Sequence, residues 1–261
     1  MDTYQDFPIR QDLSFFNFLF ILSQVFGGIA IVLVVAWGAY YNQGFAGPSS
    51  PGQWFNWHPL LMTLGLIAIQ GDSILIYRAL RNEAKPRLKS IHAALHFVAF
   101  VFVVVGLKAV FDSHNYAKTP IPNLYSLHSW IGISAVIMFA VQFLAGFVSF
   151  LYPRVRKSLR SRYLPLHVLG GTMIFILSTC AALMGITEKN IFNKDYHKLP
   201  AGAQIGNALG VCIVIFVMLV FYLVSQPAYK RIALAEEQVL PLDYSEEENT
   251  AGNSGAIGGD N

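Results

Sequence analysis

Cysteine and charge are both scarce in this chain. Its 261 residues contain two cysteines, Cys180 and Cys212, and each lies within an apolar stretch. Two thiols on separate apolar stretches do not support a disulfide framework or a cysteine metal site. Charged residues make up 13% of the chain, whereas soluble domains contain about 25%. The composition therefore indicates an integral membrane protein rather than a soluble domain, and we expect no nucleic-acid partner.

The apolar stretches also lack the alternation of polar and apolar residues that a transmembrane β-barrel requires. Helices are then the remaining structure that satisfies the backbone within lipid. A helix needs about 20 predominantly apolar residues to span the bilayer. Six segments meet this requirement: residues 15–40, 58–77, 90–110, 126–151, 164–186 and 204–225. The predicted fold class is an all-α, six-helix integral membrane protein.

These segments form one apolar block, so the sequence predicts a single transmembrane domain over residues 14–226. The first segment is too long for a signal peptide, and Arg10 is the one basic residue before it, so we expect the segment to be retained. Residues 1–13 form a short N-terminal segment. Residues 227–261 are acidic and then rich in Gly, Ser and Asn, a composition typical of a disordered tail.

Basic residues give the orientation, because Lys and Arg in short loops favour the cytoplasmic side. Twelve of the 18 basic residues fall after the second, fourth and sixth segments: Arg78, Arg81, Lys85, Arg87, Lys89, Arg154, Arg156, Lys157, Arg160, Arg162, Lys230 and Arg231. Six crossings then place both termini in the cytoplasm.

Four histidines lie at or near the starts of the four central segments. His58 and His128 enter from the outer side, whereas His92 and His167 enter from the cytoplasmic side. Facing helices of a four-helix bundle commonly build metal and cofactor sites, and imidazole suits iron, copper and zinc. A haem held on both faces by histidine would have no open position and would transfer electrons. The alternative is that these histidines are interfacial or hydrogen-bonded residues without a metal.

His96 leaves the cytoplasmic pair open on spacing alone. It follows His92 by four residues, so it lies on the same helix face, about 5.4 Å deeper. Either residue could be the ligand.

The chain resembles the cytochrome b561 family of ascorbate-dependent transmembrane electron carriers. The resemblance covers roughly residues 45–230 and depends on "FNWHPLLMTLG", "GDSILIYRALRNEAK", "KSIHAALHF", "AVFDSHN", "NLYSLHSW" and "SLRSRYLPLH", in that order. It implies two b haems between helices two to five. His58 and His128 resemble the ligands of the outer haem, and His92 and His167 those of the inner haem. His96 then resembles a residue behind the ligands.

The resemblance also interprets the basic connections, because ascorbate is an anion near neutral pH and a basic cluster would attract it. The candidate ascorbate-binding residues are Arg78, Lys85, Lys89 and Arg156, with Arg160 as a further choice. Lys89 is favoured because it lies one turn before His92. The alternative is that these residues only set the membrane orientation.

At the outer side, His114 and Asn115 are predicted to lie in a short loop before His128, where relatives bind the electron acceptor. Trp57 and Trp130 flank the outer histidines, and either pack over the haem or belong to an interfacial belt. Asp72 is charged within an apolar segment, so it either binds a neighbouring helix or tunes a haem.

A small-residue pattern, "GNALG" at residues 206–210, permits close helix packing. Because relatives are thought to be dimeric, this pattern or the first segment is one expected place for a homodimer interface.

The function predicted is electron transfer from cytoplasmic ascorbate through two b haems to an outer or lumenal acceptor, either monodehydroascorbate or a ferric chelate. The motifs leave secretory-vesicle, lysosomal or endosomal, and plasma membranes open. The competing hypothesis is a non-redox transporter or channel with structural histidines, which would show broken helices around a polar cavity.

Overall fold

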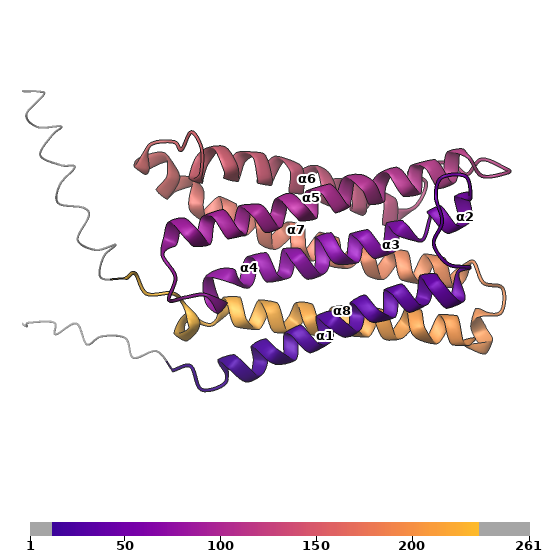
Figure 1. The fold of residues 1–261 in the computed structure, drawn as a ribbon, viewed down its shortest axis with the longest axis horizontal. Helices are drawn as coiled ribbons and strands as arrows, with labels where there is room; N and C mark the ends of the chain where they lie inside the picture. Colours follow the sequence, from indigo (N-terminus) through magenta and orange to yellow (C-terminus); the bar gives the residue numbers. More distant parts are fainter. Residues whose placement is uncertain (1–11, 235–261) are drawn as a thin grey trace, which may run out of the picture.

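The computed structural model describes residues 12–234, and this part of the chain is almost entirely helical (Figure 1). The long helices are α1 (Phe16–Ala36), α5 (Lys85–Asn115), α6 (Leu127–Phe150), α7 (Lys157–Ile191) and α8 (Ala201–Ser225). A π-helical turn, Trp37–Tyr41, extends α1. The short helix α2 (Pro51–Trp54) precedes a continuous helical stretch made of α3 (Trp57–Met62), a π-helical segment (Thr63–Ile69) and α4 (Gln70–Ala79).

Six helical stretches in the described part of the chain are long and apolar enough to cross a membrane. They are Phe16–Tyr41, Pro51–Ala79, Lys85–Asn115, Leu127–Phe150, Lys157–Ile191 and Ala201–Ser225. Each contains one of the six segments expected from the sequence, or nearly all of it. The prediction of an all-helical protein with six spans is therefore confirmed.

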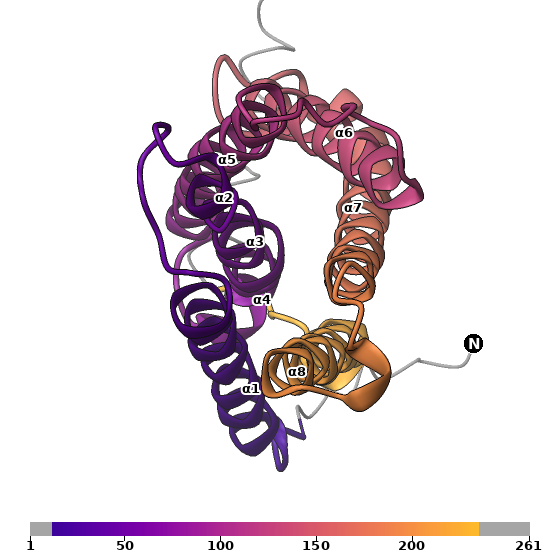
Figure 2. The same cartoon turned by 90° about the vertical axis from the view of Figure 1, so that its right-hand side faces the viewer.

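The six spans surround a common centre when the molecule is viewed from one end (Figure 2). The α3–α4 stretch packs against α5, and α6 packs against α7. Helix α8 joins the two pairs by contacting α7 and α4, and α1 packs along α8 on the outside. Four of the spans, from α3 to α7, therefore form a bundle that α1 and α8 complete.

The two ends of this bundle differ in charge. We call the end where α4 and α6 finish and α5 and α7 begin the basic end, because it carries Arg78, Arg81, Lys85, Arg87, Lys89, Arg154, Arg156, Lys157, Arg160 and Arg162. The start of α1 and the end of α8 lie at the same end (Figure 1). The other end, where α3 and α6 begin, is called the opposite end.

Helices α5 and α7 are longer than the sequence predicted, and this changes where several residues lie. Pro86 stands in the first turn of α5, where a missing backbone N–H costs nothing. Lys85 and Lys89 are therefore helical. His114 and Asn115, which were expected in a loop, form the last turn of α5. That expectation was wrong because the apolar pattern ends before the helix does.

The small-residue pattern on α8 packs within the chain. A Cβ on Gly206 would lie 3.0 Å from the Asn190 side chain, and one on Gly210 would lie 3.5 Å from Leu183. Both contacts are to α7 of the same molecule. The two glycines of "GNALG" therefore serve packing within the chain, and the expected homodimer interface stays a prediction.

Asp72 contacts a neighbouring helix. Its carboxylate accepts a hydrogen bond from Gln24 Nε2 of α1 at 2.8 Å. Of the two roles that the sequence left open, the structure therefore supplies helix contact, with α1 held to α4 by a polar pair within the apolar region.

The packed part of the chain continues past α8. Pro227–Tyr229 form a short 3-10 helix, and the buried Tyr229 ring packs edge-on against Phe16, with ring centroids 5.2 Å apart. The first residues of the expected tail are therefore packed against α1. Residues 1–11 and 235–261 lie outside the described part of the chain, so the expectations for the N-terminal segment and the rest of the tail concern residues that are not described.

Candidate functional site

A pair of histidines faces each other at the opposite end. His58 stands in the first turn of α3 and His128 in the first turn of α6, and their ring centroids are 6.1 Å apart. The Nδ1 of His58 lies 3.2 Å from the carbonyl oxygen of Gly106 on α5, and the Nδ1 of His128 lies 2.8 Å from that of Ala181 on α7. With Nδ1–H donating to a carbonyl, each Nε2 carries a free lone pair. Metal-bound histidines commonly show this arrangement.

A second pair lies toward the basic end. His92 of α5 and His167 of α7 have ring centroids 6.3 Å apart. The Nδ1 of His92 lies 2.9 Å from the carbonyl oxygen of Ser73 and 3.1 Å from its hydroxyl oxygen. The Ser73 hydroxyl also donates to the carbonyl oxygen of His92 at 3.1 Å. Ser73 thus fixes both the ring and the backbone of His92.

His167 is tied by a side-chain amide instead. Its Nδ1 lies 3.0 Å from Gln142 Nε2, which also donates to the carbonyl oxygen of His167 at 2.5 Å. An amide nitrogen can only donate, so in this arrangement Nδ1 accepts and the ring proton stands on Nε2. Metal binding through Nε2 requires the other tautomer. A half-turn of the Gln142 amide would present Oε1 to Nδ1–H but would also bring Oε1 against the His167 carbonyl oxygen, so this tautomer requires the Gln142 side chain to move as well.

The separation within both pairs suits a single bridging metal. A metal–nitrogen bond of about 2 Å, with about 1.1 Å from each ring nitrogen to its ring centre, puts two facing imidazole centres about 6 Å apart. The observed separations of 6.1 and 6.3 Å match this value. The donor set at each site is two imidazoles from different helices, which fits a haem held on both faces.

The two sites share one construction. Each histidine is tied to its neighbouring helix, and the tie is reciprocal: α3–α4 with α5, and α6 with α7. Each of α5, α6 and α7 carries one histidine and, 14 positions later, one residue that contacts a histidine of the neighbouring helix. These pairs of positions are His92 and Gly106, His128 and Gln142, and His167 and Ala181. A rise of about 1.5 Å per residue then separates the two sites by about 21 Å along the helices.

Glycine makes room for one ring at each site. A Cβ on Gly185 would lie 2.7 Å from His128 Cε1, and a Cβ on Gly146 would lie 2.8 Å from His167 Cε1. Both distances are too short for any side chain. Each glycine follows the tying residue of that histidine by four positions, Ala181 and Gln142 respectively. Helices α6 and α7 can therefore approach closely enough to hold both rings.

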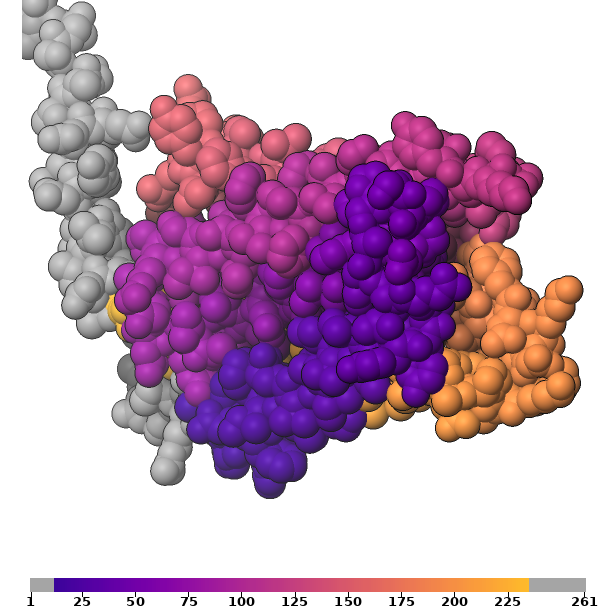
Figure 3. Space-filling view, turned by 45° about the vertical axis from the view of Figure 1, so that its right-hand side comes forward, coloured from indigo at the N-terminus to yellow at the C-terminus, as the bar shows by residue number. Residues whose placement is uncertain are grey.

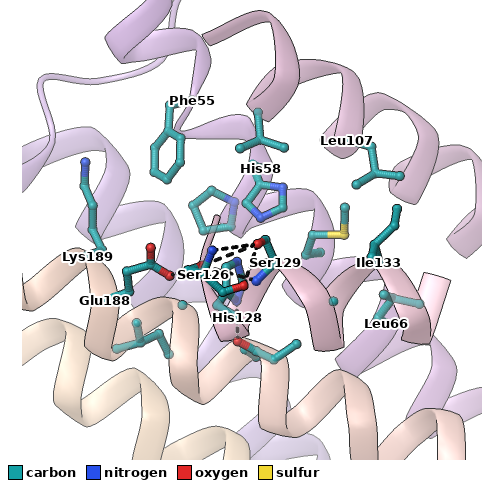
Figure 4. A pocket seen from close by; sticks show the side chains of 18 of the residues that line it. Phe55, His58, Leu66, Leu107, Ser126, His128, Ser129, Ile133, Glu188 and Lys189 are labelled. Atoms are coloured by element: carbon teal, nitrogen blue, oxygen red, sulfur yellow. Dashed lines mark hydrogen bonds between the residues drawn. The ribbon is translucent and has the colours of Figure 1, made fainter. Parts of the chain in front are cut away.

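The pair at the opposite end opens into a cavity of about 180 Å³ between α3, α5, α6 and α7 (Figure 4). Apolar side chains such as Leu66, Leu107 and Ile133 line its depth. Polar and charged groups lie toward its mouth, where Ser126 donates to Glu188 Oε2 at 2.9 Å. Lys189 also lines the cavity.

The segment before α3 lies on the surface of the molecule near the opposite end (Figure 3), and its Phe55 lines the cavity. The buried Asn56 side chain donates to the carbonyl oxygens of Asn42 and Gly44, both at 2.6 Å. This anchors residues 42–56 across the bundle and fixes the neighbouring Phe55. The Phe55 ring lies 6.1 Å from the His58 ring.

His96 lies beside the basic-end pair without completing it. Its ring centroid is 4.5 Å from that of His92 and 5.6 Å from that of Phe139. Its Nδ1 is buried and has no hydrogen-bond partner. His92, which faces His167 and is tied to Ser73, is therefore better placed than His96 to form the pair.

The basic residues proposed for ascorbate divide into two groups. Lys89 is half-buried, with the charges of Arg154, Lys85 and Arg160 around it. Arg156 is exposed at the start of α7. Arg78, by contrast, donates to the carbonyl oxygen of Val224 at 2.5 Å, so it ties α4 to the end of α8.

The polar residues expected at the outer side lie close together. Asn123 accepts a contact from His114 Nδ1 at 3.2 Å and donates to Asn115 Oδ1 at 2.8 Å. His114 and Asn123 line the cavity mouth. Trp57 and Trp130 are not among its lining residues: Trp57 packs on Phe45, and Trp130 is 66% exposed. The two tryptophans therefore do not cover the histidine pair.

Sequence reasoning missed several of these residues. They are Phe55, Ser73, Gly106, Asn123, Gln142, Gly146, Ala181, Gly185, Glu188 and Lys189. The 14-residue spacing from each histidine was a usable signal for Gly106, Gln142 and Ala181. The others depend on contacts between helices that spacing does not show.

Comparison with known proteins agrees with this arrangement. Residues 57–193, which contain all four paired histidines, match the family model described as eukaryotic cytochrome b561. The chain is 43% identical over 224 residues to the transmembrane ascorbate-dependent reductase CYB561 of Sus scrofa, covering 85% of this chain and 87% of that one. It is 42% identical over 242 residues to the plasma membrane ascorbate-dependent reductase CYBRD1 of Xenopus tropicalis, covering 91% and 84%.

Proposed function

The chain belongs to the eukaryotic cytochrome b561 family, and on that premise we propose that it is an ascorbate-dependent transmembrane reductase. In this proposal, single electrons pass from ascorbate at the basic end to an acceptor at the opposite end. The observation that carries the proposal is the pair of facing histidines toward each end of the bundle, with ring separations suited to one metal each. Family membership implies haem as that metal centre.

We assign the two haems to these pairs. His58 and His128 hold one at the opposite end, and His92 and His167 hold the other toward the basic end. A haem held by two of these histidines would supply reversible one-electron transfer. Ser73, Gly106, Gln142 and Ala181 set the orientation of the four rings.

Donor binding falls to the basic end. Ascorbate is a monoanion that loses one electron and one proton to become monodehydroascorbate, and the proton passes to water at this end. Lys89, with Lys85 and Arg156, attracts the anion and holds it near the inner pair. We exclude Arg78 from this group because its guanidinium is tied to Val224.

The acceptor binds in the cavity mouth, near His114, Asn115 and Asn123. It takes up one electron and is either monodehydroascorbate or a ferric chelate. The positive-inside rule assigns the basic end to the cytoplasm, so both ends of the described chain lie there. The membrane is that of a secretory vesicle, a lysosome or endosome, or the cell surface, and a homodimer remains part of the proposal without an assigned interface.

The test uses the purified chain in sealed vesicles that contain ascorbate, with ferric chelate or monodehydroascorbate outside. We expect the absorption bands of b haem, two haems per chain and acceptor reduction across the intact membrane. Empty vesicles and vesicles without ascorbate are the controls. Colourless protein, or reduction that requires donor and acceptor on the same side, would contradict the proposal and leave the transporter hypothesis.

A further inference from the structure

Lys189 stands at the mouth of the cavity at the opposite end. It lies in the last turn of α7, and its side chain is half-buried against the segment before α3. The Nζ is 4.6 Å from the centroid of the Phe55 ring, and that ring is 6.1 Å from the His58 ring. The ammonium is therefore separated from the outer histidine pair by one aromatic ring (Figure 4).

This ammonium has no carboxylate partner among the described residues. The ion pairs there are Arg87 with Glu83, Lys108 with Asp112, and Lys198 with Asp195. The adjacent Glu188 turns toward α6 instead, where its carboxylate accepts a hydrogen bond from Ser126. Glu188 thus joins two helices and its carboxylate is directed toward α6, whereas the Lys189 ammonium lies on the Phe55 side of the same cavity.

The side chain also has room to move. Lys189 lines a second cavity of about 300 Å³, between Trp37–Tyr41 and the start of α8, as well as the one that contains the histidines. It lies in the wall that the two cavities share. A flexible four-carbon stem held by one ring contact can carry its charge toward a bound molecule, since a lysine ammonium is a mobile point charge.

We propose that Lys189 determines the charge of the electron acceptor, so that the site selects anions. This rests on the proposed function. The two acceptors it allows share that chemistry: monodehydroascorbate and ferric chelates of net negative charge. Monodehydroascorbate is a radical anion. It takes one electron through the protein and one proton from water, and becomes the ascorbate monoanion. A ferric chelate takes one electron and becomes ferrous, without a proton. The electron in both cases comes from ascorbate at the basic end.

Two artificial acceptors of opposite charge test this directly. Ferricyanide is an anion and hexaammineruthenium(III) is a cation, and each accepts one electron without ligand exchange. The variants are Lys189→Gln and Lys189→Arg in the full chain, in sealed vesicles that contain ascorbate. We expect Lys189→Gln to slow ferricyanide reduction about fivefold or more at low salt, because charges lining a cavity raise the rate of ligand association by such factors.

The same variant should leave hexaammineruthenium(III) reduction unchanged or faster. Lys189→Arg should restore most of the ferricyanide rate. The matched control is Lys198→Gln, which removes the same charge at the same end. Because Lys198 is already paired with Asp195 and its side chain is 68% exposed, this change should alter neither rate by more than about a quarter at the same low salt.

The outcomes separate the two proposals. Equal slowing with both acceptors would mean that Lys189 acts through packing on Phe55, and unchanged rates with both would mean that it faces no acceptor; either result overturns the selectivity proposal while leaving transmembrane reduction intact. A wild-type chain that reduces neither acceptor overturns the proposed function and this inference with it. Haem content, measured in every variant, confirms that the site is assembled.

Natural acceptors form the last arm of the experiment. Monodehydroascorbate generated outside the vesicles and ferric citrate are compared at equal concentration. Both should be reduced more slowly by Lys189→Gln, and the one with the larger decrease is the better fit to the site. No decrease with either would overturn the proposal for the natural reaction.

Discussion

The two histidine pairs occupy equivalent places in one bundle, but they are held by different kinds of group. At the opposite end, both rings are tied to main-chain carbonyls, those of Gly106 and Ala181. Toward the basic end, His92 also lies against a main-chain carbonyl, that of Ser73, but side chains take part as well: the Ser73 hydroxyl and the Gln142 amide. A carbonyl in a helix has a fixed direction, whereas a hydroxyl or an amide can rotate. The pair at the opposite end is therefore oriented by helix packing alone, whereas the orientation of the other pair, and of His167 above all, also depends on side chains that can be exchanged.

The surroundings of the two histidine pairs also differ. The outer pair opens into a cavity with Glu188 and Lys189 at its mouth. The inner pair is enclosed by aromatic rings, with Tyr77 5.5 Å from His92, and Phe150 5.2 Å and Tyr163 5.8 Å from His167. The first pair therefore adjoins an opening with charged residues, whereas the second is enclosed by packed rings.

Removing one ligand from each pair should give the largest effects. We expect His128→Ala to lose the outer haem while the inner haem is still reduced by ascorbate from the basic end. His167→Ala should lose the inner haem and block reduction by ascorbate. The pyridine haemochrome assay measures haem per chain. Two haems remaining in either variant would contradict the assignment.

His96→Ala is the control for that pair of changes. Because His96 stands behind His92 and has no partner for its Nδ1, both haems should remain. Loss of the inner haem would show that His96, and not His92, is the ligand.

Filling the space beside a ring should have the next largest effect. Gly185→Ala places a methyl group 2.7 Å from His128, and Gly146→Ala places one 2.8 Å from His167. We expect each to lower haem occupancy at its own site by about half or more, since overpacking a close contact costs about 1–3 kcal/mol. Gly28→Ala is the matched control, because nothing lies within 4 Å of that position. Equal losses at both sites from either change would indicate general unfolding.

Positive charge at the basic end should affect the rate of haem reduction by ascorbate rather than haem binding. Lys89 lies three residues before His92, so both project from nearly the same helix face. We expect Lys89→Ala to slow haem reduction by ascorbate about tenfold, which corresponds to about 1.4 kcal/mol. Reduction by dithionite should be nearly unchanged, and salt should slow the wild type toward the variant.

Stopped-flow reduction at several ascorbate concentrations measures this effect. If Lys89→Ala matches the wild type while Lys85→Ala or Arg156→Ala does not, the anion binds elsewhere on the rim. If none of the three matters, the basic residues serve only to orient the chain.

The smallest expected effect concerns the hydrogen bond between Gln142 and the His167 ring. Gln142→Leu removes a hydrogen bond worth about 1 kcal/mol, which corresponds to about 40 mV for a one-electron couple. We expect the midpoint potential of the inner haem to change by about this amount while that of the outer haem stays constant. Spectroelectrochemical titration resolves the two. A shift of both potentials would mean that Gln142 acts through the bundle as a whole.

The sequence predicted the spans and the four paired histidines well, for physical reasons. Apolar length reports a helix in lipid directly, and a histidine within an apolar segment is costly in lipid unless it binds a partner. Helix ends were less predictable. His114 and Asn115 were expected in a loop because polar residues end the apolar pattern, but their backbone continues α5. Polarity marks the edge of the apolar layer, which need not be the end of the helix.

The cavity mouth could not be predicted from a single segment. Phe55, Ser126 and Lys189 come from three separate parts of the chain, and each reads locally as an ordinary aromatic, cap or interfacial residue. Arg78 has a contact of the same kind: it lies in a basic cluster in the sequence, but it donates to the carbonyl oxygen of Val224, 146 positions away. Contacts of this kind follow from how α8 packs against α4.

The π-helical segment Thr63–Ile69 has a consequence for chain length. Three of the four central spans separate their two site residues by 14 positions, but His58 and Ser73 are 15 apart. A π turn takes up one more residue than an α turn, so this segment absorbs the difference. Deleting one residue here would leave an α-helix in the same register as its neighbours. Deleting one residue between His128 and Gln142 would rotate these two residues by about 100° relative to each other. His128 and Gln142 could then not both keep their hydrogen bonds to α7. Deletion of one residue should therefore be tolerated in this one span and rejected in the other three.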